Sequence, residues 1–348
     1  MKKILITGIN GFIGSHLVDL CITKEVIIYG IERPGQVYRN LSHYLEGKVS
    51  FKEEDKLEFS GEYIMIPTDN DKLILLECDI KNAKLLDKII TKINPDIVFH
   101  LAAQPNIIPS WEDPVHTIKI NVIGTINIFE PIKKNNIKVR VVTACTAAEY
   151  GLSVQLNRPL KENDPLMAVH PYGISKIAAE LLARQYYINY GIDIINLRFF
   201  NQTGIRKIND APSDFARKIA KIELGQSEPI IQVGNLNSYR DFTDIKDSIK
   251  AIWLAGLKGT PGETYNVCSN KKIQIRYLLD TILKFTKKTI KVQEKSIQKL
   301  RKIDEDMIIG DNSKIKRELG WEPSIPIETT LKEMYNYWLE YFRKNNLN

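Results

Sequence analysis

Apolar residues follow two alternating patterns along the first two hundred positions. Short, mostly apolar runs, typical of strands that are buried on both faces, occupy 4–6, 26–31, 73–78, 97–101 and 139–144. Between these runs apolar residues recur at helical spacing, as at 12–21 and 85–93. Strands that alternate with helices predict an α/β fold with a doubly wound parallel sheet, whose ligands bind at the carboxyl ends of the strands.

The first apolar run ends in a glycine-rich turn, and a helical pattern begins directly after it. Glycine lets the backbone approach a pyrophosphate and lets the helix approach the strand, because it has no side chain. The helix N-terminus adds N–H groups and a dipole that favour an anion. Strand, turn and helix in this order predict a dinucleotide site on a Rossmann-type sheet, although the glycines alone would also suit a tight turn without a ligand. The predicted contacts of the turn are Gly8, Asn10, Gly11, Phe12, Ile13 and Gly14.

The ends of the other strands complete the predicted cofactor site. Glu32 follows Gly14 by eighteen residues, where a carboxylate binds the ribose hydroxyls of NAD and repels the 2′-phosphate of NADP, whereas the adjacent Arg33 favours NADP. We therefore expect NAD, with NADP as the alternative. His100 lies inside an apolar run and is predicted to be a packed core residue. The remaining predicted cofactor contacts are Asp79, Ile80, Leu101, Ala102, Ala103, Asn121 and Phe199.

Three residues form a predicted catalytic group. The fifth strand leads to Thr146, and a later helix carries Tyr172 and Lys176 four residues apart, on one face. A Lys charge near a phenol favours the phenolate, so we expect the Tyr172 pKa to fall from about 10 towards about 7. Tyr172 would then exchange a proton with a sugar hydroxyl as hydride moves to or from nicotinamide, and Thr146 would hydrogen-bond the same oxygen. Tyr44 and Lys48 have the same spacing but follow no strand.

Nearly the whole chain resembles the extended short-chain dehydrogenase/reductases that act on nucleotide sugars. The later segments are similar to the branch of GDP-mannose 4,6-dehydratase and GDP-4-keto-6-deoxymannose reductase. The motifs that carry this similarity are Arg198-Phe199-Phe200-Asn201, Asp214 to Ala220, Val233 to Leu236, Arg240 to Asp244, Tyr265 to Ser269, Leu300-Arg301, Glu305 and Gly320 to Pro323.

The resemblance implies a smaller C-terminal α/β lobe that binds the nucleotide diphosphate. By resemblance Asn201, Arg240 and Arg301 contact the diphosphate and ribose, and Glu305 binds a ribose hydroxyl. Fixed arginines suit a pyrophosphate, because their planar fork matches its oxygens. The full set of substrate contacts implied by the resemblance is Thr146, Asn201, Phe215, Lys218, Val233, Asn235, Arg240, Arg301 and Glu305.

Three departures from the family pattern bear on the reaction. Ala148 stands where dehydratases carry the glutamate that removes the C5 proton and where fucose-synthase-like epimerases carry a cysteine, so simple C4 redox chemistry is expected. Neighbouring Glu149 could enter the site only by a local shift, since adjacent side chains of an extended strand face opposite ways. Residues 204–206 read Gly-Ile-Arg, where Gly-Pro-Gly is common. An insertion over about 36–71 faintly resembles the tetramer-forming loop of the dehydratases.

Composition narrows the partners and the cellular setting. The 348 residues carry a formal net charge of +7, spread along the chain without a basic stripe, so we expect no nucleic-acid partner. The four cysteines show neither metal nor disulfide spacing, which predicts no metal site and a reducing cytoplasm. No apolar segment is long enough to span a bilayer, so no membrane partner is expected.

These observations predict a Rossmann domain at 1–200 and a C-terminal nucleotide-sugar lobe at 201–348 that returns segments to the sheet. The predicted reaction interconverts the C4 hydroxyl and C4 ketone of a nucleotide-diphospho-sugar, which we expect to be GDP-linked, in a homodimer or homotetramer. A 4-epimerase is the first alternative and a GDP-mannose-type 4,6-dehydratase the second. A non-catalytic dinucleotide-binding scaffold is the remaining one.

Overall fold

The structure, a computed structural model, describes residues 1–45, 65–66, 70–294 and 307–345. The chain forms two compact units. Unit 1 comprises Met1–Leu152, Pro165–Arg198 and Ile249–Tyr265, and unit 2 comprises Ser153–Asp164, Phe199–Ser248 and Asn266–Asn348. The change of unit at 198/199 lies next to the predicted boundary at 200. Within the described residues, no helix has the length and apolarity needed to cross a membrane.

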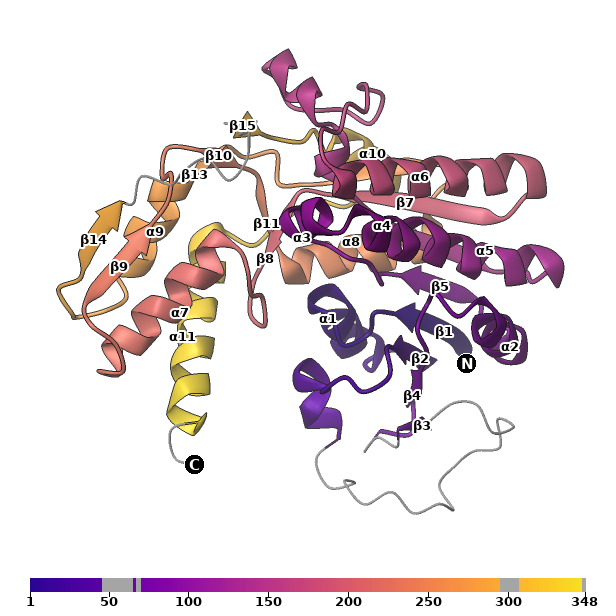
Figure 1. Cartoon of the computed structure of the whole chain (residues 1–348), viewed down its shortest axis with the longest axis horizontal. Coiled ribbons are helices and arrows are strands. Elements are labelled where there is room, and N and C mark those ends of the chain that lie inside the picture. Colours follow the sequence, from indigo (N-terminus) through magenta and orange to yellow (C-terminus); the bar gives the residue numbers. More distant parts are fainter. Residues whose placement is uncertain (46–64, 67–69, 295–306, 346–348) are drawn as a thin grey trace. The chain divides into compact units, whose positions relative to one another are not determined.

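A twisted sheet of eight strands forms the centre of unit 1 (Figure 1). Its order is β12-β7-β6-β5-β1-β2-β4-β3. After β1 the chain adds β2 and β4 on one side of β1, and it then crosses over to add β5 and β6 on the other side. The pairs among β1, β2, β4, β5 and β6 are parallel, and β3 is antiparallel to β4. The bounds are β1 Lys2–Thr7, β2 Val26–Glu32, β3 Met65–Ile66, β4 Leu73–Glu77, β5 Ile97–His100, β6 Arg140–Thr146, β7 Asp193–Phe199 and β12 Thr264–Val267.

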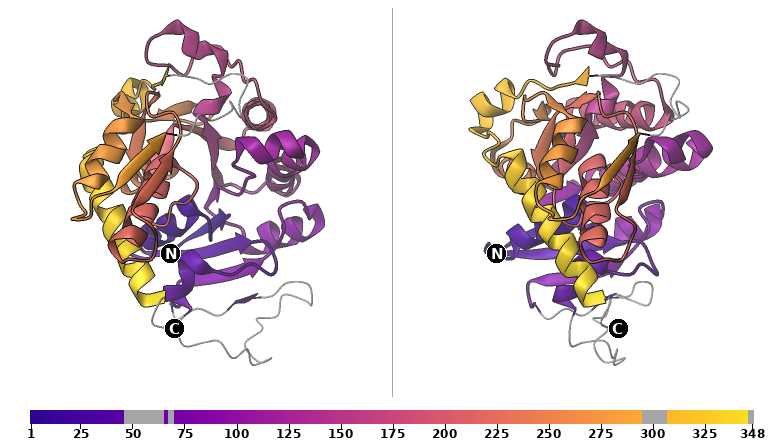
Figure 2. Two further views of the ribbon diagram at one scale, coloured as in Figure 1. Left: turned by 60° about the vertical axis from the view of Figure 1, so that its left-hand side comes forward. Right: turned by 90° about the vertical axis from the view of Figure 1, so that its left-hand side faces the viewer.

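Helices cover both faces of this sheet (Figures 1 and 2). Leu5 and Val98 belong to a buried cluster with α2, α5 and α6 on one face. Phe99 points to the other face, where a Cβ added to Gly256 of α8 would lie 2.8 Å from its ring. Both faces are therefore apolar, as the unbroken apolar runs predict. The helix bounds are α1 Phe12–Cys21, α2 Ala83–Ile93, α3 Ile107–Glu112, α4 Pro114–Ile118, α5 Gly124–Lys134, α6 Pro171–Tyr190 and α8 Ile245–Lys258.

Local signals explain where the helices begin and end. Asn82 caps α2 by accepting a hydrogen bond of 3.1 Å from Leu85 N, and the helix ends at left-handed Asn94. Pro171 occupies the first turn of α6, where its missing N–H costs nothing, and Gly191 ends that helix at φ +67°. α6 thus begins at a fixed point, one residue before Tyr172.

Unit 2 has its own apolar core. It is built mainly from α7 and α11, with α9 beside them, and its buried residues include Phe215, Ile219 and Trp338. Three small sheets accompany the helices: β13-β10-β15, β11-β8 and β14-β9. The bounds are β8 Asn201–Thr203, α7 Ala211–Glu223, β9 Ile230–Val233, β10 Tyr239–Arg240, β11 Phe242–Asp244, β13 Ile273–Gln274, α9 Ile275–Leu283, β14 Lys291–Glu294, β15 Met307–Ile308, α10 Ser313–Leu319 and α11 Ile327–Asn345.

Candidate active site

The glycine turn joins β1 to α1 at the carboxyl edge of the sheet, as predicted. Gly8 has φ +68°, and a Cβ there would lie 2.9 Å from Ala102 Cα. A Cβ on Gly14 would collide with the Gly8 carbonyl oxygen. The helix starts at Gly11 without a side-chain cap. The turn therefore has the close packing and the uncapped helix start that suit a pyrophosphate, so the residues present fit a dinucleotide.

Glu32 lies beside the glycine turn at the end of β2. Its Oε2 accepts a hydrogen bond of 3.2 Å from Asn10 N, and its side chain is 12% exposed. The Asn10 amide side chain donates to Val37 O at 2.9 Å, and Asn40 Nδ2 donates to Asn10 O at 2.8 Å. The beginning of the insertion, a short 3-10 helix at Arg39–Tyr44, is therefore attached to the cofactor turn. Exposed Arg33 lies 3.9 Å from the Glu32 carboxylate.

The other predicted cofactor residues follow the strands but differ in accessibility. Leu101, Ala102 and Ala103 continue from β5 with partial exposure, and Asp79 follows β4 in the same way. Ile80 is buried against α5, where a Cβ on Gly124 would meet its side chain. Phe199, the last residue of β7, is also buried. The buried side chains of Ile80 and Phe199 can therefore shape the site, but they offer a ligand few direct contacts.

Asn121 holds two elements of the site together. Its Oδ1 accepts from Gln104 N at 2.8 Å, and its Nδ2 donates to Gln104 O at 3.1 Å and to the Ser175 hydroxyl at 2.9 Å. The side chain is 1% exposed. Its amide therefore joins the loop after β5 to α6, and any contribution to cofactor binding passes through the position of that loop.

The predicted catalytic residues come together in unit 1. Thr146 ends β6, and its side chain neighbours Tyr172, near the start of α6, where it lowers the pKa of the phenol. Lys176 lies one turn further along α6, is buried, and donates from Nζ to Ala144 O on β6 at 2.7 Å. β6 therefore supplies both the hydroxyl that contacts Tyr172 and the carbonyl that orients Lys176.

The expectation of an acidic tyrosine is wrong. Burial raises the pKa of Tyr172 to about 12, the Thr146 hydrogen bond opposes that rise, and the charge of Glu149 adds to it. Burial also lowers the pKa of Lys176, because the ammonium loses water. Desolvation of Tyr172, which the sequence does not reveal, exceeds the opposing effect of Thr146 on its pKa. Tyr172 is a neutral phenol at neutral pH.

His170 is a site residue that the sequence reasoning did not single out. It caps α6, since its Nδ1 accepts a hydrogen bond of 2.9 Å from Gly173 N. Its ring stacks on Tyr172 with centroids 6.0 Å apart and planes at 11°. A capping side chain immediately before a first-turn proline is the signal that identifies it.

His100 is a packed core residue, as predicted. It is buried and bonded to the hydroxyls of Thr7, at 2.8 Å, and Thr125, at 3.0 Å. Burial, reinforced by the charge of Lys176, lowers its pKa to about 3. A neutral imidazole therefore bridges β1, β5 and α5.

Glu149 is turned into the interior. It is 0% exposed, and its Oε1 accepts from Thr146 N at 2.9 Å. Its Oε2 lies 3.5 Å from Arg198 Nε on β7. The carboxyl group is thus engaged beneath Thr146.

Two of the predicted substrate residues lie together in unit 2. Asn201 Nδ2 donates to Asp241 O at 3.1 Å, and Arg240 is half-buried on β10. Asp241, next to Arg240, is fully buried and accepts from Ser269 N at 2.7 Å, Asn270 N at 2.9 Å and Gly310 N at 3.2 Å. Asp241 fixes the backbone that carries Arg240, a role that the sequence reasoning did not assign.

The remaining predicted substrate residues divide into three groups. Phe215 and Val233 are packed in the unit 2 core, so a substrate contact there would be made through the backbone. Lys218 and Asn235 are exposed. Arg301 and Glu305 lie outside the described residues, as do 46–64 of the predicted insertion.

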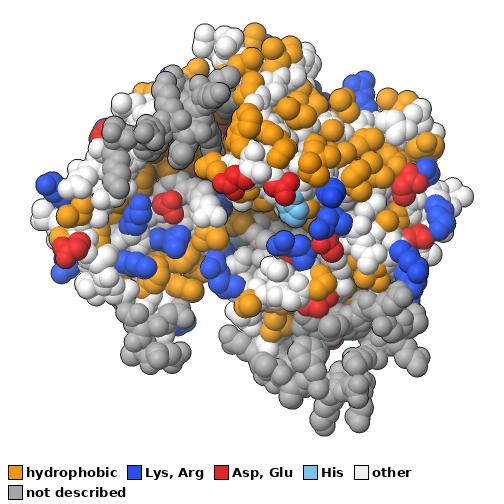
Figure 3. All heavy atoms as spheres, viewed as in Figure 1, with side chains coloured by type: hydrophobic (Ala, Val, Ile, Leu, Met, Phe, Trp, Pro, Cys, Tyr) orange, Lys and Arg blue, Asp and Glu red, His pale blue; other side chains and the backbone are white. Residues whose placement is uncertain are grey.

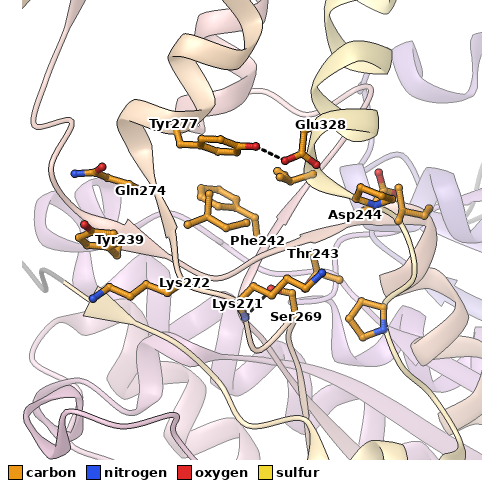
Figure 4. Close-up of a pocket in the computed structure, with 15 residues that line it drawn as sticks. Tyr239, Phe242, Thr243, Asp244, Ser269, Lys271, Lys272, Gln274, Tyr277 and Glu328 are labelled. Carbon is orange, nitrogen blue, oxygen red and sulfur yellow. Dashed lines mark hydrogen bonds between the residues drawn. The ribbon is translucent and has the colours of Figure 1, made fainter.

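Unit 2 also contains a cavity of about 450 Å³ between β10, β13 and the start of α11 (Figure 4). The Tyr277 hydroxyl donates to Glu328 on one side of the cavity, and Lys271 and Lys272 lie along the other. The Lys272 ammonium lies 4.2 Å from the Tyr239 ring centre. Of the predicted substrate residues that the structure describes, none lines this cavity.

Comparison with known proteins agrees with this architecture. The family model for GDP-mannose 4,6 dehydratase matches residues 5–334. The chain is 26% identical to a GDP-mannose 4,6-dehydratase of Yersinia enterocolitica, over 96% of this chain and 93% of that one. It is 28% identical to a GDP-6-deoxy-D-mannose reductase of Pseudomonas aeruginosa, over 70% and 80%.

A solved structure shows the same fold. The RMD protein of Pseudomonas aeruginosa, solved with NADPH, superposes with a TM-score of 0.79 at 23% identity, covering 98% of this chain and all of that one. The expected Rossmann-type architecture of an extended short-chain dehydrogenase/reductase is confirmed. The chain belongs to the GDP-mannose 4,6-dehydratase family.

Proposed function

We propose that this oxidoreductase interconverts the C4 hydroxyl and the C4 ketone of a GDP-linked sugar with NAD or NADP. The observation that carries the proposal is the joining of Thr146, Tyr172 and Lys176 by β6 and α6, with alanine at 148. The family relatives named as a dehydratase and a reductase of GDP sugars support the nucleotide class.

Each catalytic side chain has one task at the C4 oxygen. Tyr172 exchanges the proton with that oxygen, and Thr146 hydrogen-bonds the same atom and fixes its distance from Tyr172. Lys176, oriented by Ala144 O, holds a positive charge beneath the phenol as negative charge develops. The nicotinamide supplies or accepts the hydride. Gly8, Gly11 and Gly14 would hold its pyrophosphate, and Glu32 the adenosine ribose.

The protonation state of Tyr172 favours reduction of a ketone. A phenol whose pKa is raised to about 12 carries its proton at neutral pH, as an acid that protonates the C4 oxygen must. Oxidation would require the phenolate, which burial disfavours. The reductase direction is therefore our first assignment, and the dehydrogenase is its reverse.

The dehydratase is less well supported. Removal of a C5 proton needs a base, and alanine at 148 has none. The nearest carboxyl group, on Glu149, accepts from Thr146 N and faces Arg198 in the interior. Bringing it into the site would unpair buried groups, which is costly.

We propose NAD as the cofactor because the Glu32 carboxylate repels a 2′-phosphate, although the RMD structure contains NADPH. Asn201, Arg240, Arg301 and Glu305 would bind the nucleotide diphosphate, as the resemblance implies. All four cysteines are free and buried, which supports a reducing cytoplasm.

We also propose a homo-oligomer that associates through α3, α4 and α6. Apolar side chains gather over this part of unit 1 (Figure 3). A stable interface needs such a patch. The exposed apolar residues on these helices are Ile108, Trp111, Val115, Ile118, Ile174, Leu181, Tyr187, Ile188 and Tyr190.

The test incubates the purified protein with GDP-sugars and each dinucleotide, follows nicotinamide absorbance and identifies the product. We expect NADH oxidation with a GDP-4-keto-6-deoxy sugar. A 6-deoxy-4-keto product from GDP-mannose would show a dehydratase and overturn the argument from Ala148. Conversion between C4 epimers without net absorbance change would show an epimerase, and no reaction with any sugar would show a scaffold.

A further inference from the structure

The interior beneath the catalytic residues contains two buried carboxyl groups and one guanidinium. Glu149 and Glu180 are 0% and 6% exposed, and Arg198 is 4% exposed. Arg198 binds Glu180 with both arms of its fork, through Nε at 2.9 Å and Nη2 at 2.5 Å, and its Nη1 donates to the Tyr150 hydroxyl at 2.9 Å. Arg198 thus directs Nε and Nη2 to Glu180 and Nη1 to Tyr150.

One oxygen of Glu149 lacks a donor. Oε1 accepts from Thr146 N, but Oε2 has no hydrogen-bond partner among the described residues, because Arg198 Nε is 3.5 Å away and bonded to Glu180. A buried carboxylate oxygen without a donor is expensive. The neighbouring group that could share a bond with it is the Glu180 carboxyl, which lies within 4.8 Å, and two carboxyl groups bond only through a proton.

We propose that Glu149 is a positioning residue that retains a proton and donates it in a hydrogen bond to Glu180. The group buried beneath Thr146 is then a neutral carboxylic acid rather than a second carboxylate. The proposal concerns the same site as the proposed function, and its catalytic consequence rests on that function. Its structural part, the shared proton, does not.

The surrounding charges agree with this assignment. Burial, followed by the charge of Glu180, raises the pKa of Glu149 well above its ordinary value. Burial opposes the ionisation of Glu180 too, but Arg198 holds its pKa below the ordinary value. The Cys145 thiol, whose pKa burial raises, lies within 4.8 Å of both carboxyl groups. Cys145, Glu149 and Glu180 are spaced like cation ligands, but Arg198 already supplies the positive charge there.

A proton on Glu149 matters for two catalytic groups. An ionised Glu149 would raise the pKa of Tyr172, and its negative charge would offset part of the positive charge of Lys176. Both of these residues belong to α6. The acceptor oxygen of Glu149 also fixes the turn that presents Thr146, whose own Oγ1 accepts from Ala148 N at 3.3 Å. Glu149 therefore sets both the charge beneath Tyr172 and the direction of Thr146.

The direct test needs no substrate. Infrared difference spectra of protein labelled with δ-¹³C glutamate, recorded at pH 8, should show the carbonyl stretch of a protonated carboxylic acid. The band should disappear in Glu149→Gln and persist in Glu130→Gln, a matched change at a half-exposed glutamate of α5. Absence of the band from the wild type, or its persistence in Glu149→Gln, would overturn the proposal.

Turnover measures the positioning role. Glutamine keeps the acceptor for Thr146 N and offers an N–H to Glu180, whereas leucine offers neither. We expect Glu149→Leu to lower kcat by at least about tenfold, the size of one lost buried hydrogen bond, with unchanged affinity for NAD. Turnover of the wild type should decline at alkaline pH as Glu149 loses its proton. Glu149→Gln should recover most of the loss seen in Glu149→Leu and should not show this decline. Equal losses in the two folded variants would refute the positioning role, and failure of every sugar substrate would refute the proposed function while leaving the infrared result intact.

Discussion

Lys176 Nζ donates a hydrogen bond of 2.7 Å to Ala144 O, two residues before Thr146 on the same strand. One backbone segment thus orients the lysine and carries the threonine. The ammonium is thus directed by a neutral backbone carbonyl rather than by a carboxylate.

Lys176→Met should remove this charge while keeping the length of the side chain. We expect kcat to fall on the order of a hundredfold, because developing negative charge in a buried site loses its stabilisation. Single-turnover measurements with saturating dinucleotide would follow the loss. Lys84→Met, on the exposed start of α2, is the matched control and should behave as the wild type.

Tyr172→Phe removes the proton donor and little else. The ring stacks on His170, a contact that phenylalanine preserves. We expect turnover to fall by about a hundred- to ten-thousandfold. Dinucleotide affinity, measured by calorimetry, should remain nearly unchanged. Comparable activity in this variant would exclude Tyr172 from the chemistry.

Glu32→Ser should weaken discrimination between the two dinucleotides. The carboxylate repels a 2′-phosphate, and Arg33 beside it attracts one. We expect the ratio of NADP to NAD dissociation constants to fall at least about tenfold, which corresponds to roughly 1.4 kcal/mol. Titration of each cofactor into wild type, Glu32→Ser and the exposed control Glu25→Ser would measure the ratio. An unchanged ratio would show that Glu32 does not contact the ribose.

Stability should decline in mild acid because of His100. Burial lowers its pKa in the folded protein to about 3, whereas the unfolded chain titrates at the ordinary value of 6.5. The unfolded state therefore binds more protons below pH 6.5, and the free energy of unfolding falls as pH decreases from 6.5 towards 3. Across that whole window the loss is about 5 kcal/mol.

Urea unfolding at several pH values between 7.5 and 5 would test this dependence. His100→Asn removes the titrating group, so its unfolding free energy should change less steeply with pH even if the variant is less stable overall. His43→Gln, at an exposed histidine, should keep the wild-type slope. Identical slopes for His100→Asn and wild type would contradict the assignment.

The sheet and the glycine turn were predictable because they depend on local patterns. In the run at 97–101, adjacent residues such as Val98 and Phe99 face opposite sides of the sheet, and both are apolar. A strand that is buried on both faces requires this pattern. The pairing of β12 with β7 depends on contacts between distant segments, and so does the assignment of Ser153–Asp164 to unit 2. The hydrophobic periodicity of a sequence does not predict contacts between distant segments.

The sequence predicted the helix that carries Tyr172 and Lys176, but it did not predict their electrostatics. Spacing placed Tyr172 and Lys176 on one face of a helix, yet the pKa of Tyr172 depends on burial, which only the fold determines. Glu149, Glu180 and Arg198 come from three separate elements, so their contact was invisible in sequence. Phe215 has the pattern of a family motif, and the structure places it in a core.

The hydrogen bonds from Asn10 to Val37 and from Asn40 to Asn10 close a ring of backbone around one edge of the cofactor turn. Because these hydrogen bonds already order the segment, a ligand restricts its backbone little further on binding. The conformational entropy of the segment is therefore lost during folding rather than at binding. Dissociation of a dinucleotide should then depend on these hydrogen bonds, so its residence time should respond to substitutions at Asn40, which bonds the Asn10 carbonyl.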